Sequence, residues 1–357
     1  MVRVGLVGTG GIARSHAQAL RAHAERTRLV AVADVDQDRA RQFAEQHRVA
    51  GCYGDLETML GAERPDLVCI CTPPFLHAEQ AIACLRSGAW AWCEKPLCGS
   101  LADLDRISDA EGVHGPYCSS VVQWRFGSAG RHLKALIDEE AMGRLLVGIC
   151  QTTWYRDRAY YEVPWRGRWD TELGGVTMGH GIHAIDLFLW LLGDWEELSA
   201  MTGTLDREIA VEDTSLAIVR FGRGAMGSIV NSVLCPRQES YLRFDFQRGT
   251  VEARTLYGYT NGHWTYTPLP GTEESEAARW ADLGVDVRAS HEAQLGTLLD
   301  AMDAGRHPPA GLGEIRPTFE LLSALYRSAA TGRAVRRGEI APGDPFYDHV
   351  AGMAAVG

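Results

Sequence analysis

The chain has 357 residues, of which 46% are hydrophobic and 23% are charged, and its formal net charge is −11. This composition is typical of a globular protein with room for two domains, and it excludes an intrinsically disordered chain. The negative charge would repel a phosphate backbone, so we expect no nucleic-acid partner. The longest apolar stretch, residues 187–192, is too short to cross a bilayer, and the N-terminus lacks the features of a signal peptide. We therefore expect a cytoplasmic protein without a membrane partner.

The first third of the chain alternates short apolar runs with segments of helical spacing. Ile12, Ala13, His16 and Leu20 repeat at helical spacing, and the apolar runs predict strands at residues 3–7, 29–33, 49–53, 67–71, 90–93 and 117–122. Runs that are apolar throughout are typical of strands buried on both faces of a parallel sheet. The alternation therefore predicts an α/β fold, with a doubly wound Rossmann domain over residues 1–123.

From about residue 145, strand-like segments follow one another directly. We predict strands at residues 145–154, 198–205, 215–221, 225–233, 241–247 and 250–257, and helices at residues 179–192, 290–304 and 314–331. Several strands alternate polar and apolar residues, which indicates an antiparallel sheet with one wetter face. We expect an α+β domain with a largely antiparallel open sheet over residues 124–340, followed by a C-terminal tail, residues 341–357. Residues from about 334 onward look exposed or wrapped around a partner.

The nine cysteines are scattered, and several lie inside apolar runs, as Cys69, Cys71 and Cys93 do. No pair has the CxxC spacing of a zinc or redox site. We therefore expect buried free thiols in a reducing compartment.

The segment Gly8-Thr-Gly10-Gly11-Ile12-Ala13 follows a predicted strand and opens a predicted helix. This is the context that a dinucleotide-binding G-x-G-x-x-G/A loop requires. Gly8 would permit the tight turn, Gly10 would let the backbone approach the pyrophosphate, and Ala13 would keep helix and strand close. The alternative is a glycine turn without a ligand.

Asp34 ends the second strand, 21 residues after Ala13, where a carboxylate would accept the ribose hydroxyls. A 2′-phosphate would meet Asp34, Asp36 and Asp38 with only Arg39 nearby. We therefore predict NAD as the cofactor, with NADP less favoured. Asp34 as a turn or capping residue remains the alternative.

Motifs spread over nearly the whole chain point to one family. They are Gly8–Ala13, Thr72-Pro73-Pro74 with His77, Glu94-Lys95-Pro96, Gly181-Ile-His183-Ala-Ile-Asp186, Val211-Glu-Asp213, Ser290-His-Glu-Ala-Gln294 and Ala324–Ser328. With these motifs the chain resembles the Gfo/Idh/MocA oxidoreductases, the family of glucose–fructose oxidoreductase and inositol dehydrogenase. The resemblance implies a Rossmann domain and a second domain whose open sheet often mediates dimerisation. We accordingly expect a homodimer or homotetramer.

The resemblance also implies the roles of individual residues. Lys95 would lie beside the nicotinamide and act with His183 on the substrate, and Thr72, Pro73, His77 and Glu94 would surround the cofactor. This chemistry is sensible, because alcohol oxidation needs a base near neutrality and a cation for the developing alkoxide. For His77, a capping role is the alternative.

One departure from the family pattern lies before His183. Many members place an aspartate four residues earlier, and here that residue is Gly179. His180 lies on the same predicted helix face as His183 and could orient the substrate, share proton transfer or line the pocket. Asp186 could contact substrate or anchor the helix. The same three residues could in principle share a metal, but no further ligand is evident and we expect none.

Residues 154–169 concentrate aromatic and arginine side chains just before this helix. Aromatic faces suit a sugar or polyol ring, so Trp165 and Arg166 are candidate substrate-binding residues. Arg156 or Arg166 could instead bind a carboxylate, which would mean a sugar acid. Bracing of a domain or subunit contact is the alternative.

The function expected is therefore NAD-dependent hydride transfer to or from a hydroxyl or keto carbon of a sugar, polyol or sugar-acid-like molecule. Two alternatives remain open. One is a catalytically silent NAD-binding sensor or regulator, for which Gly179 is the only hint. The other is an NAD-dependent, redox-neutral glycosidase.

Overall fold

The computed structural model describes residues 1–352, which form two compact units, each made of two stretches of chain. Unit 1 comprises Met1–Val121 and His291–Arg316; unit 2 comprises Val122–Ser290 and the chain from Pro317 onward. These bounds differ from the predicted ones, which place residues 291–316 in the second domain. The structure groups them with unit 1 because Leu295, Leu298 and Leu299 are buried in the core that also holds helix α1.

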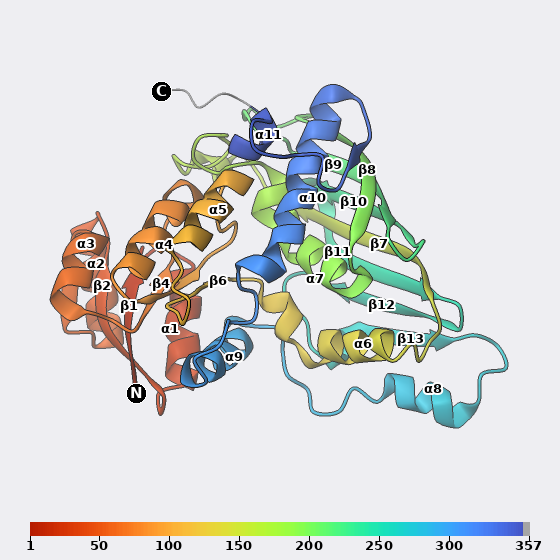
Figure 1. Cartoon of the computed structure of the whole chain (residues 1–357), viewed down its shortest axis with the longest axis horizontal. Coiled ribbons are helices and arrows are strands. Elements are labelled where there is room, and N and C mark those ends of the chain that lie inside the picture. Colours follow the sequence, from red (N-terminus) through yellow and green to blue (C-terminus); the bar gives the residue numbers. More distant parts are fainter. Residues whose placement is uncertain (353–357) are drawn as a thin grey trace. The chain divides into compact units, whose positions relative to one another are not determined.

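Unit 1 is built on a six-stranded parallel sheet in the order β3-β2-β1-β4-β5-β6 (Figure 1). The strands are β1 (Val2–Val7), β2 (Thr27–Ala33), β3 (Gly51–Tyr53), β4 (Leu67–Ile70), β5 (Trp90–Cys93) and β6 (Cys118–Ser120). Each falls within or overlaps a predicted strand. The chain order reverses between β1 and β4, and in open α/β sheets ligands bind beyond the strand ends at such a point.

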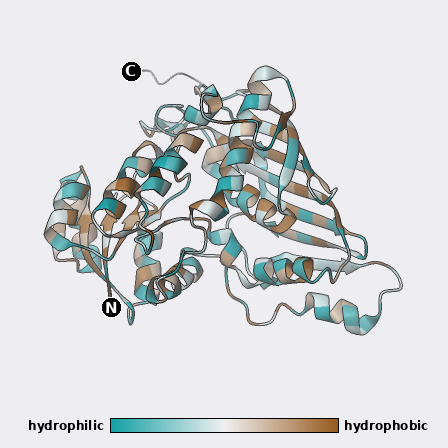
Figure 2. Ribbon diagram, viewed as in Figure 1, coloured by the Kyte–Doolittle hydropathy of each residue, from teal (hydrophilic) through white to brown (hydrophobic). Residues whose placement is uncertain are grey.

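Helices cover this sheet in unit 1. They are α1 (Ala13–Ala22), α2 (Gln37–His47), α3 (Leu56–Glu63), α4 (His77–Arg86), preceded by the 3₁₀ turn η1 (Pro74–Leu76), α5 (Leu101–Ala110) and α9 (His291–Asp303). Three of them begin at a capping side chain, since Asp36, Asp55 and Ser100 each accept a bond from a backbone N–H three residues on. Figure 2 shows hydrophobic and hydrophilic residues mixed along these helices, as expected when one face packs on a sheet.

Unit 2 contains an eight-stranded sheet in the order β13-β12-β11-β7-β10-β9-β8-β14. The strands are β7 (Leu145–Tyr155), β8 (Trp195–Gly203), β9 (Thr214–Phe221), β10 (Met226–Ser232), β11 (Leu234–Phe246), β12 (Gly249–Thr255), β13 (Trp264–Pro268) and β14 (Val335–Arg336). Every pair is antiparallel except β7 with β10. The six predicted strands are present, while β13 and the two-residue β14 were not predicted.

The other elements of unit 2 are the short turns η2 (Gln123–Phe126), η3 (Ala159–Glu162) and η5 (Asn261–His263), the π-helical segment η4 (Thr177–Gly181), and helices α6 (Ser128–Asp138), α7 (Ile182–Leu192), α8 (Glu274–Ala281) and α11 (Pro345–Asp348). Helix α10 (Leu312–Thr331) begins in the last residues of unit 1 and continues into unit 2. Helix α7 packs on one face of the sheet. There Phe188 lies so close to Gly148 that a Cβ on the glycine would be 2.7 Å from its ring. This close approach requires glycine on β7.

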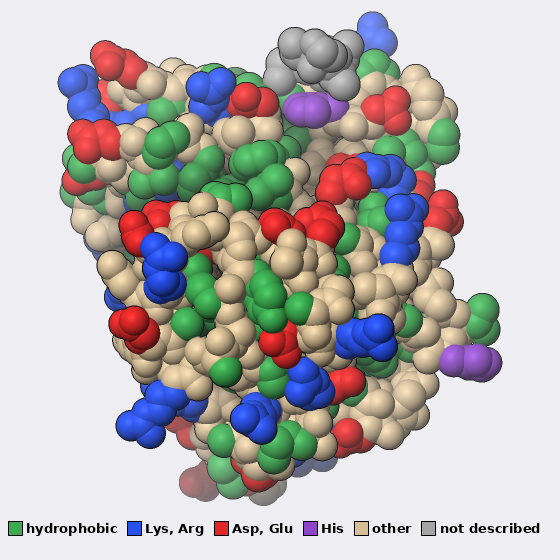
Figure 3. Space-filling view, turned by 90° about the vertical axis from the view of Figure 1, so that its left-hand side faces the viewer, with side chains coloured by type: hydrophobic (Ala, Val, Ile, Leu, Met, Phe, Trp, Pro, Cys, Tyr) green, Lys and Arg blue, Asp and Glu red, His purple; other side chains and the backbone are tan. Residues whose placement is uncertain are grey.

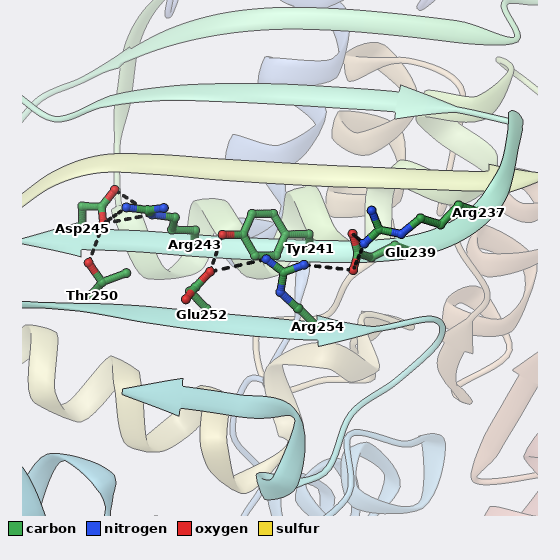
Figure 4. A network of polar contacts seen from close by, with 8 residues as sticks. All are labelled: Arg237, Glu239, Tyr241, Arg243, Asp245, Thr250, Glu252 and Arg254. Carbon is green, nitrogen blue, oxygen red and sulfur yellow. Dashed lines mark hydrogen bonds and ion pairs between the residues drawn. The ribbon is translucent and has the colours of Figure 1, made fainter. Parts of the chain in front are cut away.

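The opposite face of the sheet carries exposed side chains of two kinds. Met201, Leu216, Ile218 and Met226 on β8, β9 and β10 form an exposed apolar group. Figure 4 shows the second kind, a ladder of alternating charges along β11 and β12 in which Arg254 reaches both Glu239 and Glu252. The alternating pattern read from residues 241–247 therefore corresponds to this open face.

The chain from residue 334 is mostly exposed or half-buried, as expected, but three residues anchor it. Val335 pairs with β8, and Tyr347 and Val350 are buried. Residues 353–357 of the predicted tail lie outside the described residues.

All nine cysteines are free thiols, and seven of them are buried as expected, whereas Cys52 is exposed and Cys235 half-buried. Within residues 1–352, no helix is both long enough and apolar enough to span a bilayer.

Candidate active site

The glycine loop between β1 and α1 leaves backbone open toward a ligand. Gly8 has φ +85°, and a Cβ there would lie 2.7 Å from backbone atoms of Cys71 and Thr72. No other residue fits without moving β1 from β4. At Gly10 and Gly11 a Cβ would meet no heavy atom within 4 Å, so the loop has a bare outer side. Ala13 is fully buried at the start of α1. These positions fit the dinucleotide loop predicted from the sequence.

Asp34 lies beside this loop at the end of β2. Its Oδ2 accepts bonds from the backbone N–H and the hydroxyl of Thr9, at 2.7 and 2.9 Å, and Arg39 binds both carboxylate oxygens, at 2.7 and 3.1 Å. Burial alone would raise the pKa of Asp34, but the bonds from Arg39, Asp36 N–H and Thr9 outweigh it and lower the pKa. The carboxylate is therefore ionised. The cap of α2 is Asp36, not Asp34.

His77 joins the segments that follow β4 and β5. Its Nδ1 lies 2.7 Å from the carbonyl oxygen of Pro96, and its Nε2 lies 2.8 Å from that of Thr72. Burial lowers the pKa of His77, although the two carbonyls favour the protonated ring. Because both ring nitrogens contact backbone carbonyls, His77 positions Thr72 and the residue after Lys95. We therefore reassign it from a cofactor contact to a support of the loops.

Glu94 is a buried carboxylate held by two histidines. His16 from α1 and His291 from α9 each place Nε2 at 2.9 Å from its Oε1, and Trp92 packs against both rings. Burial would raise the pKa of Glu94, but the bonds from the two histidines outweigh it and hold the pKa well below the usual value. Glu94 thus anchors the backbone next to Lys95 and is not placed as a cofactor contact.

Within the described residues, His16, Glu94 and His291 are the one group of three potential metal ligands whose atoms lie within 4.8 Å of one another. In this group the two histidines both contact the same carboxylate oxygen, Glu94 Oε1, as N–H donors do. His180, His183 and Asp186, the set weighed from the sequence, do not form such a group.

Lys95 is the one residue between positions 91 and 100 that is not buried. It follows β5, and its backbone N–H contacts Glu94 Oε2 at 3.2 Å. The backbone around it is therefore fixed, and the residue itself is half-buried.

In unit 2, His183 lies on the first turn of α7 among aromatic rings. Its ring is stacked at 6.4 Å from Trp124 and meets the edge of Tyr257 at 5.3 Å, measured between ring centres. Neither aromatic residue was identified from the sequence, because each is distant in the chain and belongs to no motif.

His180 lies on the π-helical turn before α7, a type of distortion that occurs frequently at functional sites. Arg156 Nε donates to its Nε2 at 3.1 Å, and the hydroxyl of Tyr160 lies 3.3 Å from the same atom. Nε2 is therefore an acceptor, which places the ring proton on Nδ1 and leaves the imidazole neutral. This nitrogen is already engaged and is poorly suited to remove a substrate proton.

A carboxylate approaches Gly179 from elsewhere in the chain. Glu172 is buried, its Oε2 accepts the N–H of Gly167 at 2.5 Å, and its Oε1 lies 3.4 Å from Arg166 Nη1. A Cβ on Gly179 would lie 3.5 Å from that Oε1. An aspartate at position 179, where many members of the family have one, would therefore lie beside the carboxylate of Glu172. Glu172 was not found from the sequence, since no spacing rule connects it to Gly179.

Asp186 does not face a substrate. Its side chain is completely buried, and its two oxygens each accept a 2.6 Å bond from Arg125, while Thr318 donates to Oδ1 at 3.0 Å. Of the two roles considered, anchoring of the helix is the one the geometry supports. The assignment of Asp186 as a substrate contact is thus corrected.

Arg166 and Trp165 belong to an aromatic and cationic cluster. The guanidinium carbon of Arg166 lies 3.9 Å from the ring centre of Tyr160 and 4.3 Å from that of Trp165. Through Tyr160 this cluster contacts His180. The structure therefore brings Trp165, Arg166 and His180 together within unit 2.

Known proteins resemble this chain over most of its length. Residues 2–120 match the family described as "Oxidoreductase family, NAD-binding Rossmann fold", and residues 131–252 match "GFO/IDH/MocA C-terminal domain". The chain is 28% identical to myo-inositol 2-dehydrogenase of Thermotoga maritima over 95% of this chain and 99% of that protein. It is 25% identical to D-xylose 1-dehydrogenase (NADP(+)) 2 of Haloferax volcanii, over 93% of this chain and 98% of that protein. Among solved structures, the WlbA dehydrogenase of Bordetella pertussis, in complex with NADH and UDP-GlcNAcA, is 27% identical and has a TM-score of 0.84. The match covers 94% of this chain and 97% of that one.

The buried histidine–carboxylate group predicts a loss of stability in mild acid. Burial lowers the pKa of His16, so the unfolded chain takes up a proton first as the pH falls below about 6.5. Urea unfolding between pH 7.5 and 5 should show a falling free energy of unfolding, by up to about 1.4 kcal/mol per pH unit for this group. His16→Gln retains a donor but cannot titrate, and should reduce the slope.

The exposed His114 provides the matched control, and His114→Gln should leave the slope as in the wild type. An unchanged slope in His16→Gln would contradict the assignment.

Proposed function

Because the chain belongs to the Gfo/Idh/MocA oxidoreductases, we propose that it transfers hydride between NAD and a hydroxyl or keto carbon of a sugar, polyol or sugar-acid-like substrate. The observation that carries this proposal is the loop from Gly8 to Ala13, bare on its outer side and flanked by the ionised Asp34. The relatives reported above act on sugars or polyols by name, or bind NADH with a sugar acid.

NAD, when bound, supplies the nicotinamide carbon that accepts or donates the hydride. The loop Gly8–Ala13 would hold the pyrophosphate with backbone N–H groups, and Asp34 would accept bonds from the ribose hydroxyls. Thr72 and Pro73, which follow β4, would border the cofactor. His77 and Glu94 would not contact the cofactor themselves but would fix the backbone of the segments that do.

Lys95 and His183 are the proposed catalytic residues. The chain has only two lysines among 35 Lys and Arg residues, so a lysine at position 95 departs from its own strong preference for arginine. A compact ammonium suits donation to one developing alkoxide, whereas a guanidinium suits planar bidentate ligands. His183 would take the hydroxyl proton during oxidation and return it during reduction.

For His180 we propose a binding role on the substrate side, with Trp165 and Arg166 in the same cluster. Its Nε2 accepts from Arg156, so the neutral ring can present an N–H donor but not that nitrogen as a base. The silent-sensor alternative rested on the missing carboxylate at Gly179. Glu172 lies beside that position, which removes the one hint in its favour. No observation favours the redox-neutral glycosidase.

The catalytic assignment is tested by a panel of sugars, polyols and sugar acids read by NADH absorbance. Wild-type protein should turn over one class. Lys95→Ala and His183→Ala should each lower kcat by about 100-fold or more while retaining NAD affinity in calorimetry. Lys134→Ala, at the other lysine, should behave as wild type. Full activity in either catalytic variant would remove that residue from the mechanism, and NAD binding without any turnover would overturn the oxidoreductase.

We further propose NAD in preference to NADP. The ionised Asp34 would repel a 2′-phosphate, and the cation next to it, Arg39, is already bound to both of its oxygens. One relative is named as NADP-dependent, so the preference is a property of this chain and not of the family.

Removal of the Asp34 charge should shift cofactor preference. Asp34→Asn should change the NADP-to-NAD affinity ratio toward NADP by about tenfold or more, because Arg39 is released to meet a phosphate. Calorimetric titration of both cofactors measures this ratio. Asp109→Asn removes an exposed charge on α5, outside this acidic segment, and should leave the ratio unchanged. An identical ratio in both variants would refute the role of Asp34.

We propose that the chain associates through the open face of the unit 2 sheet, as a homodimer or as part of a homotetramer. Exposed apolar groups of this kind mark association surfaces, and Ile218, within the group on β8, β9 and β10, is 67% exposed.

Light scattering should find an oligomer for wild type and a smaller species for Ile218→Asp, while Leu205→Asp, outside the sheet, should not change the mass. A monomeric wild type would disprove this interface.

The remaining partners and the compartment are also proposals. On the face drawn in Figure 3, basic side chains are interspersed with acidic ones, which together with the net charge of −11 speaks against a nucleic-acid partner. Nine unpaired cysteines are consistent with a reducing compartment, and we propose the cytoplasm.

A further inference from the structure

Two arginines of unit 2 are held in fixed orientations around one tyrosine. The guanidinium carbons of Arg156 and Arg166 lie 5.2 and 3.9 Å from the ring centre of Tyr160. Arg156 also lies 5.0 Å from the ring centre of Trp154, and Arg166 lies 4.3 Å from that of Trp165. Stacking on aromatic rings orients a guanidinium without neutralising its charge.

The positive charge of this pair is only half compensated. Arg166 faces the buried carboxylate of Glu172 at 3.4 Å. Among residues 1–352, Arg156 forms no ion pair; Asp157, an acidic residue that acts on it electrostatically, is exposed to solvent. The neutral His180 adds no charge, since it accepts from Arg156. Two guanidiniums against one carboxylate leave an excess of one positive charge.

Both arginines are partly desolvated, which makes the excess costly. Burial lowers the pKa of Arg156 and of Arg166, and for Arg166 the bond to Glu172 only partly offsets this. A bound anion would relieve this cost, because it would face two oriented cations in surroundings of reduced polarity.

Donors remain available for such an anion. Arg156 uses Nε for His180 and Nη1 for the carbonyl of Tyr155, and Arg166 uses Nη1 for Tyr160 and Glu172. In the described part of the chain, Nη2 of Arg156 and both Nε and Nη2 of Arg166 make no hydrogen bond to protein. Both side chains are half-buried, so these donors are accessible to a small molecule.

We propose that Arg156 and Arg166 bind a carboxylate of the substrate, which makes the substrate a sugar acid such as a uronate or aldonate. A carboxylate is planar, takes paired N–H donors, and carries the single negative charge that balances the site. A phosphate ester, close to a dianion at neutral pH, would leave the site negatively charged. This inference rests on the proposed function only for the identity of the bound molecule as substrate.

The test compares matched compounds in the NAD-loaded protein. D-glucuronate, D-galacturonate and D-gluconate are titrated beside D-glucose, D-galactose, D-glucitol and the two hexose 6-phosphates, by calorimetry and by NADH absorbance. The acids should bind with roughly 10- to 100-fold higher affinity than their neutral parents. Turnover, where present, should show the same preference in kcat/KM.

Variants separate recognition from general structure. Arg156→Gln should weaken acid binding by roughly 10- to 100-fold and abolish the preference for the acid over its neutral parent. Arg156→Lys retains the positive charge but lacks the paired N–H donors of a guanidinium, so it should lose less acid affinity than Arg156→Gln but not match the wild type. Arg158→Gln is the matched control, since Arg158 belongs to the same segment and its side chain is 82% exposed.

The outcomes are distinct. Acid binding without turnover would support the carboxylate site and overturn the oxidoreductase. Turnover of neutral compounds with no preference for acids, or an equal loss for acids and neutral parents in Arg156→Gln, would overturn the site and leave the oxidoreductase intact. Preference for the 6-phosphates, or no binding of any acid at millimolar concentration, would also overturn it.

Discussion

The architecture of unit 1 depends on one buried negative charge. A carboxylate without water must be paired and hydrogen-bonded, because an unpaired buried ion costs several kcal/mol. Glu94 meets this requirement with His16 and His291, which come from opposite ends of the unit's sequence. The same charge therefore ties the helix after the glycine loop, the segment that holds Lys95 and a helix near the C-terminus into one packed body. The geometry next to Lys95 follows from satisfying Glu94.

Unit 2 uses a different arrangement, in which donors converge on a neutral ring. Arg156 and Tyr160 both face Nε2 of His180, and the aromatic rings around them keep the guanidiniums in fixed planes. Such preorganisation lowers the entropy lost when a polar ligand binds. The neighbouring His183 lies between different rings, those of Trp124 and Tyr257. Glu172 supplies a buried carboxylate to the network.

The sequence predicted what is local or periodic. Strands such as β4 are apolar throughout because both faces are covered, and the loop at Gly8 has glycines where the backbone demands them, so both were found. Residues 291–316 show helical spacing, but spacing does not indicate on which sheet a helix packs. Glu172 and Asp186 were missed or misjudged for the same reason, because their partners Arg166, Gly179 and Arg125 are fixed only by tertiary packing. A two-residue strand such as β14 has no period to detect.

The divided composition of unit 1 has a consequence for synthesis on the ribosome. Residues 1–121 leave the exit tunnel while the segment that supplies His291 has not yet been translated, and the delay is on the order of ten to thirty seconds at typical elongation rates. During that interval Glu94 has His16 but lacks its second donor, and the core surface that Leu295, Leu298 and Leu299 will cover faces solvent. The nascent unit 1 therefore exposes apolar surface until residues 291–316 emerge, and a fragment that ends at residue 121 lacks the part of the core that helix α9 supplies.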